Sequence, residues 1–312
     1  MLIDVMQKNF THPVHEEITN LIFGCDAAPE ACVDPEIGFT PPSVQAGVRW
    51  NDDPPFRLDA TGIPECHSDQ TIRLVTQPVC WYKLFRHAEK RAASTYFDGN
   101  SKRWNTMYRS QFGDLQFVHA ITSRDGETAG VTRDRILMWA EFVWSIVLGE
   151  LKTDTRLINV PTNGFSVFFP RSGQSVSDLF TLGNSSVRRY IPDVAFGSLL
   201  HMVEDSFAFA NAERLAPEPG ALCPNSGEAH PGVIRSFRSY SNQDHKKHGG
   251  FDSRESFQQL LLQSPNVIDV GKVIVALYDQ KAAWPSVERY LRCVFEVLDE
   301  TVPATPGDGL SR

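Results

Sequence analysis

Apolar residues recur at helical spacing along most of the chain. The clearest case is residues 135–151, where the apolar positions form one wide face: Ile136, Trp139, Val143, Ile146 and Val147. Similar patterns predict further helices over residues 11–24, 79–99, 104–121, 199–210, 254–263, 267–283 and 286–300. Strand-like alternation is scarce, so the pattern predicts a mainly α fold, a multi-helix bundle.

Other segments lack this periodicity. Residues 25–48 and 213–233 are rich in Pro and Gly and are predicted to be loops, and residues 152–192 are irregular. The tail at 301–312 has the composition of a flexible segment. We therefore expect one α-helical domain over residues 1–300, followed by that tail.

Composition excludes some classes of protein. The net charge of −8 argues against a broad electrostatic grip on a nucleic-acid duplex, which requires many basic side chains. The sequence has no apolar run long enough to span a bilayer, and its first residues do not resemble a signal peptide. These features predict a chain that is cytoplasmic as synthesised, or exported by a specialised route.

The six cysteines are dispersed and form no CxxC pair, which is a poor pattern for a zinc finger or a disulfide-rich scaffold. Cys25 and Cys32 are spaced to bridge a loop in an oxidising compartment. Free thiols remain the equal alternative.

His201 and Asp205 lie four residues apart in the predicted helix at 199–210. Side chains at this spacing project from the same helix face, so an imidazole and a carboxylate there can bind one divalent metal ion. The alternative is a hydrogen-bonded pair within a core helix.

Further candidate ligands are scattered along the chain. His15 lies on the apolar face of the first predicted helix, where a core histidine is the alternative to a ligand. Asp52 and Asp53 occupy a turn, in which Asp is common for local reasons, and His67 follows in a loop. Asp114 and His119 flank the apolar part of the helix predicted at 104–121, and His245, His248 and Asp252 crowd into one polar stretch. A buried Asp needs a partner or a cation, whereas an exposed one needs neither.

Imidazoles and carboxylates without cysteine suit catalytic zinc better than structural zinc. The complete set of candidate metal ligands is His15, Asp52, His67, Asp114, His119, His201, Asp205, His245, His248 and Asp252.

In the order of these motifs, the chain resembles the zinc-dependent phospholipases C and single-strand-specific zinc nucleases, which share an α-helical fold and a trinuclear zinc site. His15 in HEEIT resembles the early ligand of that family, and Asp52 and His67 resemble the next two. His201 with Asp205 resembles the bridging His-x-x-x-Asp, and His248 with Asp252 resembles the last pair. The resemblance implies two or three Zn²⁺ ions.

The chain departs from the family in several places. Asn211 stands where a further ligand His is expected, and Ser110, Asp114 and His119 form a competing register for the bridging motif. The spacing implies insertions at about 70–192 and 212–240. The amino-terminal Trp ligand is missing, with His245 or His119 as candidate replacements.

The resemblance implies a phosphodiester hydrolase, with phospholipase C acting on phospholipid headgroups at a membrane surface as the leading hypothesis. Asp52 is the candidate that orients or deprotonates the attacking water, and Asp53 is the second candidate. The first alternative is a nuclease on single-stranded DNA or RNA, since Phe168, Phe169, Phe207 and Phe209 suit a base-stacking platform as well as an apolar rim. The second is a helical interaction protein with a decayed site. A toxin-like effector with a protective partner protein is a variant of the leading hypothesis.

Overall fold

The computed structural model describes residues 13–25, 32, 39–58, 63–101, 103–182, 185–251 and 253–311. The α-helices are α2 (Val14–Ile22), α3 (Pro42–Val48), α4 (Pro78–Ala92), α5 (Thr106–Phe112), α6 (Ala129–Val147), α7 (Val176–Thr181), α8 (Ile191–Asp205), α9 (His245–Phe251), α10 (Arg254–Leu260), α11 (Val267–Asp279) and α12 (Trp284–Val294). Short 3-10 turns are η2 (Gln116–His119), η3 (Leu157–Asn159), η4 (Phe165–Phe168), η5 (Ser185–Tyr190) and η6 (Tyr240–Asn242). Strands β1 (Ala212–Arg214) and β2 (Ile234–Phe237) pair antiparallel. The mainly α class is therefore confirmed.

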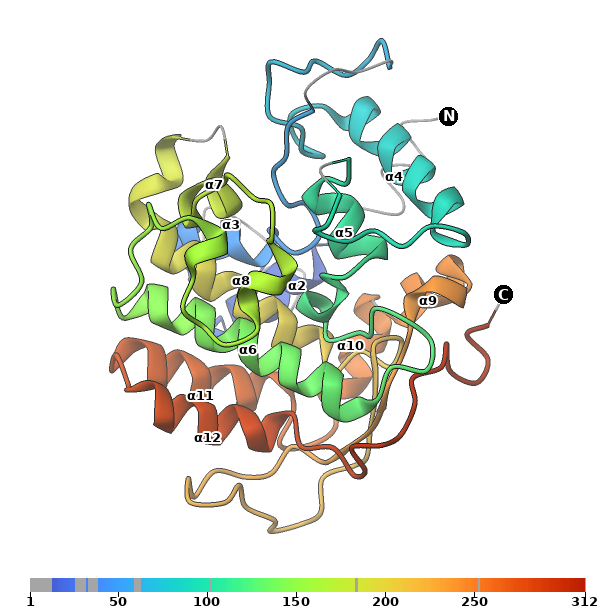
Figure 1. Ribbon diagram of the computed structural model, residues 1–312. Coiled ribbons are helices and arrows are strands. Elements are labelled where there is room, and N and C mark those ends of the chain that lie inside the picture. The colour runs from blue at the N-terminus through green and yellow to red at the C-terminus, as the bar shows by residue number, and fades with distance from the viewer. Residues whose placement is uncertain are drawn as a thin grey trace.

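Helix α8 is the centre of the larger hydrophobic core. Every residue from Val194 to Asp205 is buried, because α8 packs against α2, α3, α6 and α11. A helix that is apolar on all sides is typical of such a position. Figure 1 shows α11 and α12 side by side near α6, which covers another side of α8. The polar residues in the last turn of α8 are thus held in the interior.

Two glycines allow α3 to lie directly on α8. A Cβ atom on Gly47 would lie 2.1 Å from the carbonyl oxygen of Val194, and one on Gly197 would lie 2.1 Å from that of Val44. The two backbones therefore touch where any side chain would separate them. This contact places the turn after α3, which carries Asp52, over the last part of α8.

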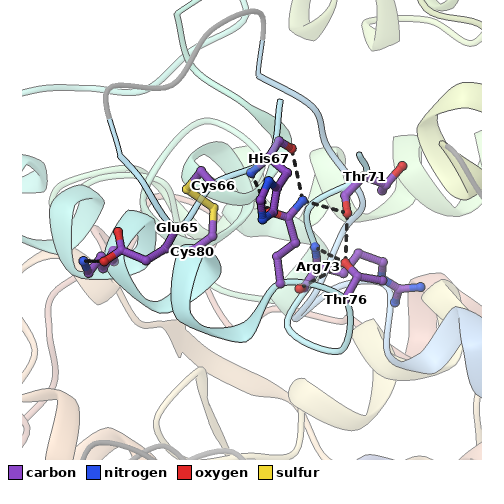
Figure 2. The surroundings of a disulfide bond; sticks show 9 residues. Glu65, Cys66, His67, Thr71, Arg73, Thr76 and Cys80 are labelled. Atoms are coloured by element: carbon purple, nitrogen blue, oxygen red, sulfur yellow. Dashed lines mark hydrogen bonds and ion pairs between the residues drawn. A yellow bond between two sulfur atoms is a disulfide. The ribbon is translucent and has the colours of Figure 1, made fainter. Parts of the chain in front are cut away.

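A smaller hydrophobic core lies between α4, α5 and the segment that contains Phe56 and Ile72. Trp81 and Tyr108 are among its buried aromatic residues. The disulfide between Cys66 and Cys80 anchors the loop in front of α4 to this core, as Figure 2 shows. In Figure 1, α4 and α5 occupy the side of the molecule opposite α11 and α12.

All six cysteines are paired, as Cys25–Cys32, Cys66–Cys80 and Cys223–Cys293. The structure thus selects the bridged alternative for Cys25 and Cys32 and adds two bridges that the sequence analysis did not anticipate. The partners of those two bridges are 14 and 70 residues apart, and the fold brings them together.

Several predictions about individual segments are wrong. The segment 25–48 contains α3 instead of being all loop, and residues 245–251, which are absent from the predicted helices, form α9. Residues 301–311 are packed on the body of the molecule, because Ala304 and Leu310 are buried and Ser239 donates its backbone N–H to the Thr305 carbonyl. Residues 70–192, expected to be an insertion relative to the family, supply α6 to the main core.

Within the described residues, none of the helices has the length and apolar character needed to cross a bilayer.

Candidate metal centre

Five of the predicted ligands meet at the end of α8. His201 and Asp205 come from its last turns, His15 from α2, Asp52 from the turn after α3, and His119 from η2. They form two overlapping groups of potential ligands that share His201: His15, His201 and Asp205, and Asp52, His119 and His201. Residues far apart in the sequence therefore converge on one small region.

Three atoms lie closest together. Asp205 Oδ2 is 2.9 Å from His119 Nδ1 and 3.0 Å from His201 Nε2, and the two nitrogens are 3.3 Å apart. Donor atoms around a tetrahedral Zn²⁺ with bonds of about 2.1 Å lie about 3.4 Å from one another. The spacing is close to that of ligands around one ion. Asp52 Oδ1, 4.0 Å from His201 Nε2, lies on the solvent side of this triad, because its side chain is 59% exposed.

The hydrogen bonds of His119 indicate that this triad needs a positive charge, either on the ring or on a bound metal ion. Its Nε2 is 3.0 Å from the carbonyl oxygen of Asn51, which only accepts, so Nε2 carries a proton. Its Nδ1 faces the Asp205 carboxylate, so without a cation the ring must be protonated on both nitrogens to satisfy both partners. A metal ion bound at Nδ1 would satisfy the same geometry with a neutral ring.

The pKa shifts of Asp205 and His119 also indicate that the triad favours a positive charge. Burial opposes the ionisation of Asp205, but the surrounding imidazoles, His201 foremost, hold the pKa of its carboxyl well below the ordinary range. Burial likewise opposes the charging of His119, yet its hydrogen bond to Asp205 and the charge of that carboxylate raise the pKa of His119. The site therefore stabilises a buried anion that demands positive charge beside it. The C-terminal end of α8, with its partial negative charge, adds to that demand.

His15 approaches the other oxygen of Asp205. Its Nε2 is 3.5 Å from Asp205 Oδ1, and its Nδ1 is 2.9 Å from Glu204 Oε2. Glu204 is buried and also accepts a hydrogen bond from Thr19 Oγ1 at 2.8 Å. When a carboxylate accepts a hydrogen bond from Nδ1–H, Nε2 is the nitrogen that can bind a metal ion, and this is a common arrangement around metal-bound histidines.

Asn51 and Asn211 hold His119 in place. The buried Asn51 amide donates to the carbonyl oxygens of Val118 and Ser198, and Asn211 Nδ2 donates to the His119 carbonyl oxygen at 2.8 Å. Ala120, directly after His119, has a φ of 48° in the left-handed region, where a non-glycine residue is strained. Asn211 thus supports the backbone of a candidate ligand.

Glu204 and Asn51 belong to the site but do not stand out in the sequence pattern. Each is adjacent to a recognised candidate, Asp205 or Asp52, and a buried polar residue beside a predicted ligand is the signal that could have identified them.

Four other candidates lie outside the two groups. Asp53, the second candidate for catalysis, points away: it accepts a hydrogen bond from the Leu74 backbone and pairs with Arg73. Asp114 is held by Arg109 at 2.8 and 3.0 Å and by the Gly99 N–H, so its charge is already compensated.

His67 is exposed beside the Cys66–Cys80 disulfide, where its backbone hydrogen-bonds Gln77 (Figure 2). His248 Nδ1 is 2.7 Å from Gln243 Oε1, and its ring packs on Tyr240. Asp252 and the side chain of His245 lie outside the described residues.

An apolar pocket borders the group on the α2 side. His15 and Glu204 contribute to its wall, and the remainder is largely apolar, including Val14, Phe251 and Phe257. Phe251 is 39% exposed and its ring lies 5.1 Å from that of Phe209, which is equally exposed. Of the four phenylalanines considered from sequence for a rim or platform, Phe168, Phe169 and Phe207 are instead buried.

Comparison with family models, with curated proteins and with solved structures finds no match for this chain, and the case for a function comes from the geometry described above.

Proposed function

We propose that the His–Asp group at the end of α8 binds divalent metal ions, with Zn²⁺ as the preferred ion, and that the protein is a metal-dependent phosphodiester hydrolase. The observation that carries the proposal is the convergence of His119 Nδ1, His201 Nε2 and Asp205 Oδ2 within 3.3 Å of one another. Two imidazoles and a carboxylate, buried and without cysteine, form a ligand set typical of catalytic zinc.

The described residues suit two ion positions. His119, His201, Asp205 and Asp52 would hold the first, and His15 with the second oxygen of Asp205 would contribute to the other. A bound zinc ion supplies Lewis acidity toward a phosphoryl oxygen and acidifies water near neutral pH. Asp52 is the residue that would orient the attacking water, because it is the exposed carboxylate of the group.

A phospholipid is the substrate that the surroundings favour. The pocket beside His15 has no Lys or Arg among its described lining residues, and the exposed Phe209–Phe251 pair lies next to it. This apolar rim suits contact with a lipid surface better than contact with a charged sugar–phosphate backbone. The function proposed is therefore that of a phospholipase C.

A nuclease acting on single strands is the second candidate. The same Phe209–Phe251 pair favours it, because exposed aromatic rings beside a metal site can stack with unpaired bases.

The third candidate, a helical interaction protein with a decayed site, rested on Asn211. Since the Asn211 side chain supports the backbone of His119, its presence gives no reason to infer a lost ligand.

Three disulfides bear on where the protein works. Disulfide bonds persist in oxidising environments. Of the two alternatives, a cytoplasmic protein and an exported one, we therefore favour the exported protein.

Metal content is the first test. Elemental analysis of the purified protein should find about two zinc ions per chain, and His201→Ala or Asp205→Asn should remove both. His67→Ala is the matched control, because it deletes an exposed imidazole outside the group and should leave the content unchanged. A wild-type protein that binds no divalent metal, even after dialysis against zinc, would exclude the proposal.

Activity is the second test. Phosphatidylcholine vesicles and a single-stranded oligonucleotide are assayed in parallel, with and without chelator. Release of phosphocholine that is lost on chelation, restored by zinc and absent in His201→Ala supports the phospholipase. Cleavage of the oligonucleotide alone would favour the nuclease, and turnover of either substrate by a metal-free protein would contradict both.

A further inference from the structure

A second cleft, separate from the candidate metal centre, lies between the two hydrophobic cores. It has a volume of about 550 Å³ and is lined by residues 56–58, 99, 101, 103–106, 109, 169 and 171–174. This volume is in the range of sites for small ligands, about 300 to 1,000 Å³. The cleft lining does not include the five side chains of the candidate metal centre, here called the metal group: His15, Asp52, His119, His201 and Asp205.

The cleft is strongly basic, although the chain as a whole carries a net charge of −8. Four arginines line it, namely Arg57, Arg103, Arg109 and Arg171, and no Asp or Glu is among its described lining residues. In the part of the chain that the structure describes, Arg57, Arg103 and Arg171 form no ion pair with a carboxylate. Positive charge gathered in a hollow without compensation indicates an anionic ligand.

Arg109 is the fixed member of this set. It is buried, Asp114 holds its Nε and Nη2 atoms, and Nη2 also donates to the Phe168 carbonyl oxygen. Its Nη1 atom has no hydrogen-bond partner among the described residues. The Arg109–Asp114 pair therefore adds an ordered guanidinium to the lining of a cleft whose other arginines are exposed.

The remaining lining suits a polar ligand. Ser101, Asn105, Thr106 and Gln174 provide hydroxyl and amide groups, and Trp104 lies within 5.7 Å of the Arg103 guanidinium. A guanidinium matches the geometry of phosphate oxygens and forms paired charged hydrogen bonds with them. Several guanidinium groups in one hollow fit the multiple charges of a phosphate better than a single carboxylate.

We propose that this cleft is a binding site for a small phosphate-bearing anion, independent of the metal centre. The two sites are neighbours, because Phe56 on the cleft wall is four positions after Asp52, and four positions span at most about 14 Å. The ligand is small and multiply charged, with an inorganic or an organic phosphate as the two sources of the same chemistry.

Binding of pyrophosphate to the full-length, metal-depleted protein tests the proposal. Calorimetric titration should show one site per chain, and the intrinsic fluorescence should change because Trp104 lies in the cleft. Arg57→Gln/Arg171→Gln should weaken the binding at least tenfold. The matched control is Arg292→Gln, which removes an exposed arginine of α12 that is paired with Glu288, and it should bind as the wild type does. Because the cleft is open to solvent, affinity should also fall as salt is added.

Other results would overturn the proposal. Equal affinity of the wild type and the double arginine variant would show that the cleft is not the site, as would an absence of binding. Loss of pyrophosphate binding in Asp205→Asn would assign the anion to the metal group. A single-stranded oligonucleotide that binds tenfold more tightly than pyrophosphate, and depends on the same two arginines, would assign the cleft to a polymer. Adenosine monophosphate, titrated beside inorganic phosphate, distinguishes the two sources: tighter binding of the nucleotide identifies an organic phosphate.

Discussion

Glu204 controls which nitrogen of His15 faces Asp205. Its two oxygens accept hydrogen bonds from His15 and Thr19. Glu204→Gln removes the negative charge of this acceptor, so the hydrogen bond from His15 Nδ1 becomes weaker. We expect metal at the His15 position to bind about tenfold more weakly, in line with the effect of similar supporting residues in other metal sites. Zinc titration followed by calorimetry measures this change.

Glu288→Gln on α12 is the control, because it removes a carboxylate that pairs with Arg292 on the surface. It should leave both zinc affinities unchanged. Wild-type affinity in Glu204→Gln would mean that the contact with His15 has no bearing on metal binding.

Asp53 should make the stability of the protein depend on pH. Its burial, opposed by the Arg73 guanidinium, raises the pKa from 3.8 to about 6. The folded protein therefore holds this proton more tightly than the unfolded chain, and stability falls as the pH rises from about 4 to 6. A pKa difference of this size corresponds to about 3 kcal/mol.

The measurement compares the unfolding free energy of the wild type with that of Asp53→Asn between pH 4 and 7. The variant lacks the titrating group, so the difference between the two curves should change by about that amount and level off above pH 6. Parallel curves would contradict the expected pKa.

The sequence identified the candidate ligands that share a helix or a helix face. It did not distinguish candidates whose role depends on residues distant in the chain. The four-residue spacing of His201 and Asp205 identifies them as a pair, and the apolar face of the first helix points His15 inward. Asp53 and Asp114 were indistinguishable from Asp52 by type and context. They differ because the fold supplies Arg73 and Arg109 as their partners.

At the level of elements, the contact between α3 and α8 sets the position of Asp52. Gly197→Ala would place a methyl group 2.1 Å from the Val44 carbonyl oxygen, so the helices must separate. We expect a loss of about 2 kcal/mol in the free energy of unfolding, as is usual for overpacked interiors. Zinc content should also fall, because Asn51 and Asp52 move with α3. Chemical denaturation and elemental analysis measure the two effects.

Gly250→Ala is the matched control, since a Cβ at that position meets no atom within 4 Å. It lies in α9, where alanine should stabilise the helix slightly. If Gly197→Ala unfolds at the same denaturant concentration as the wild type, the helices adjust without cost and the close contact does not position the site.

Helix periodicity predicted most of the long helices but not the short ones. The segment Pro42–Val48 has seven residues, too few for a clear periodic pattern, and its helix is stabilised by its contact with α8. The carboxyl-terminal segment is likewise held by contacts with distant parts of the chain, although its composition resembles that of a flexible tail. There, Leu310 is buried and its carbonyl oxygen accepts the Asp244 N–H, a contact between residues 66 positions apart that no local pattern reveals.

At the scale of the whole molecule, the Cys223–Cys293 disulfide closes the longest covalent loop. It ties the segment before β2 to α12 across 70 residues. In the chain-entropy account of cross-links, closing a loop of that length in the unfolded chain is worth about 4 kcal/mol. The double variant Cys223→Ser/Cys293→Ser should lose about that much stability, as measured by denaturant unfolding under non-reducing conditions.

The short Cys25–Cys32 loop provides the internal comparison, because its partners are 7 residues apart. The same account gives about 2 kcal/mol for Cys25→Ser/Cys32→Ser, roughly half the loss expected for the long loop. Zinc content should be unchanged in both variants if the packing around α8, rather than the cross-links, positions the metal group. Equal losses in the two variants would show that local packing around the sulfur atoms outweighs chain entropy. Loss of zinc with a retained fold would show instead that the cross-link itself helps to assemble the site.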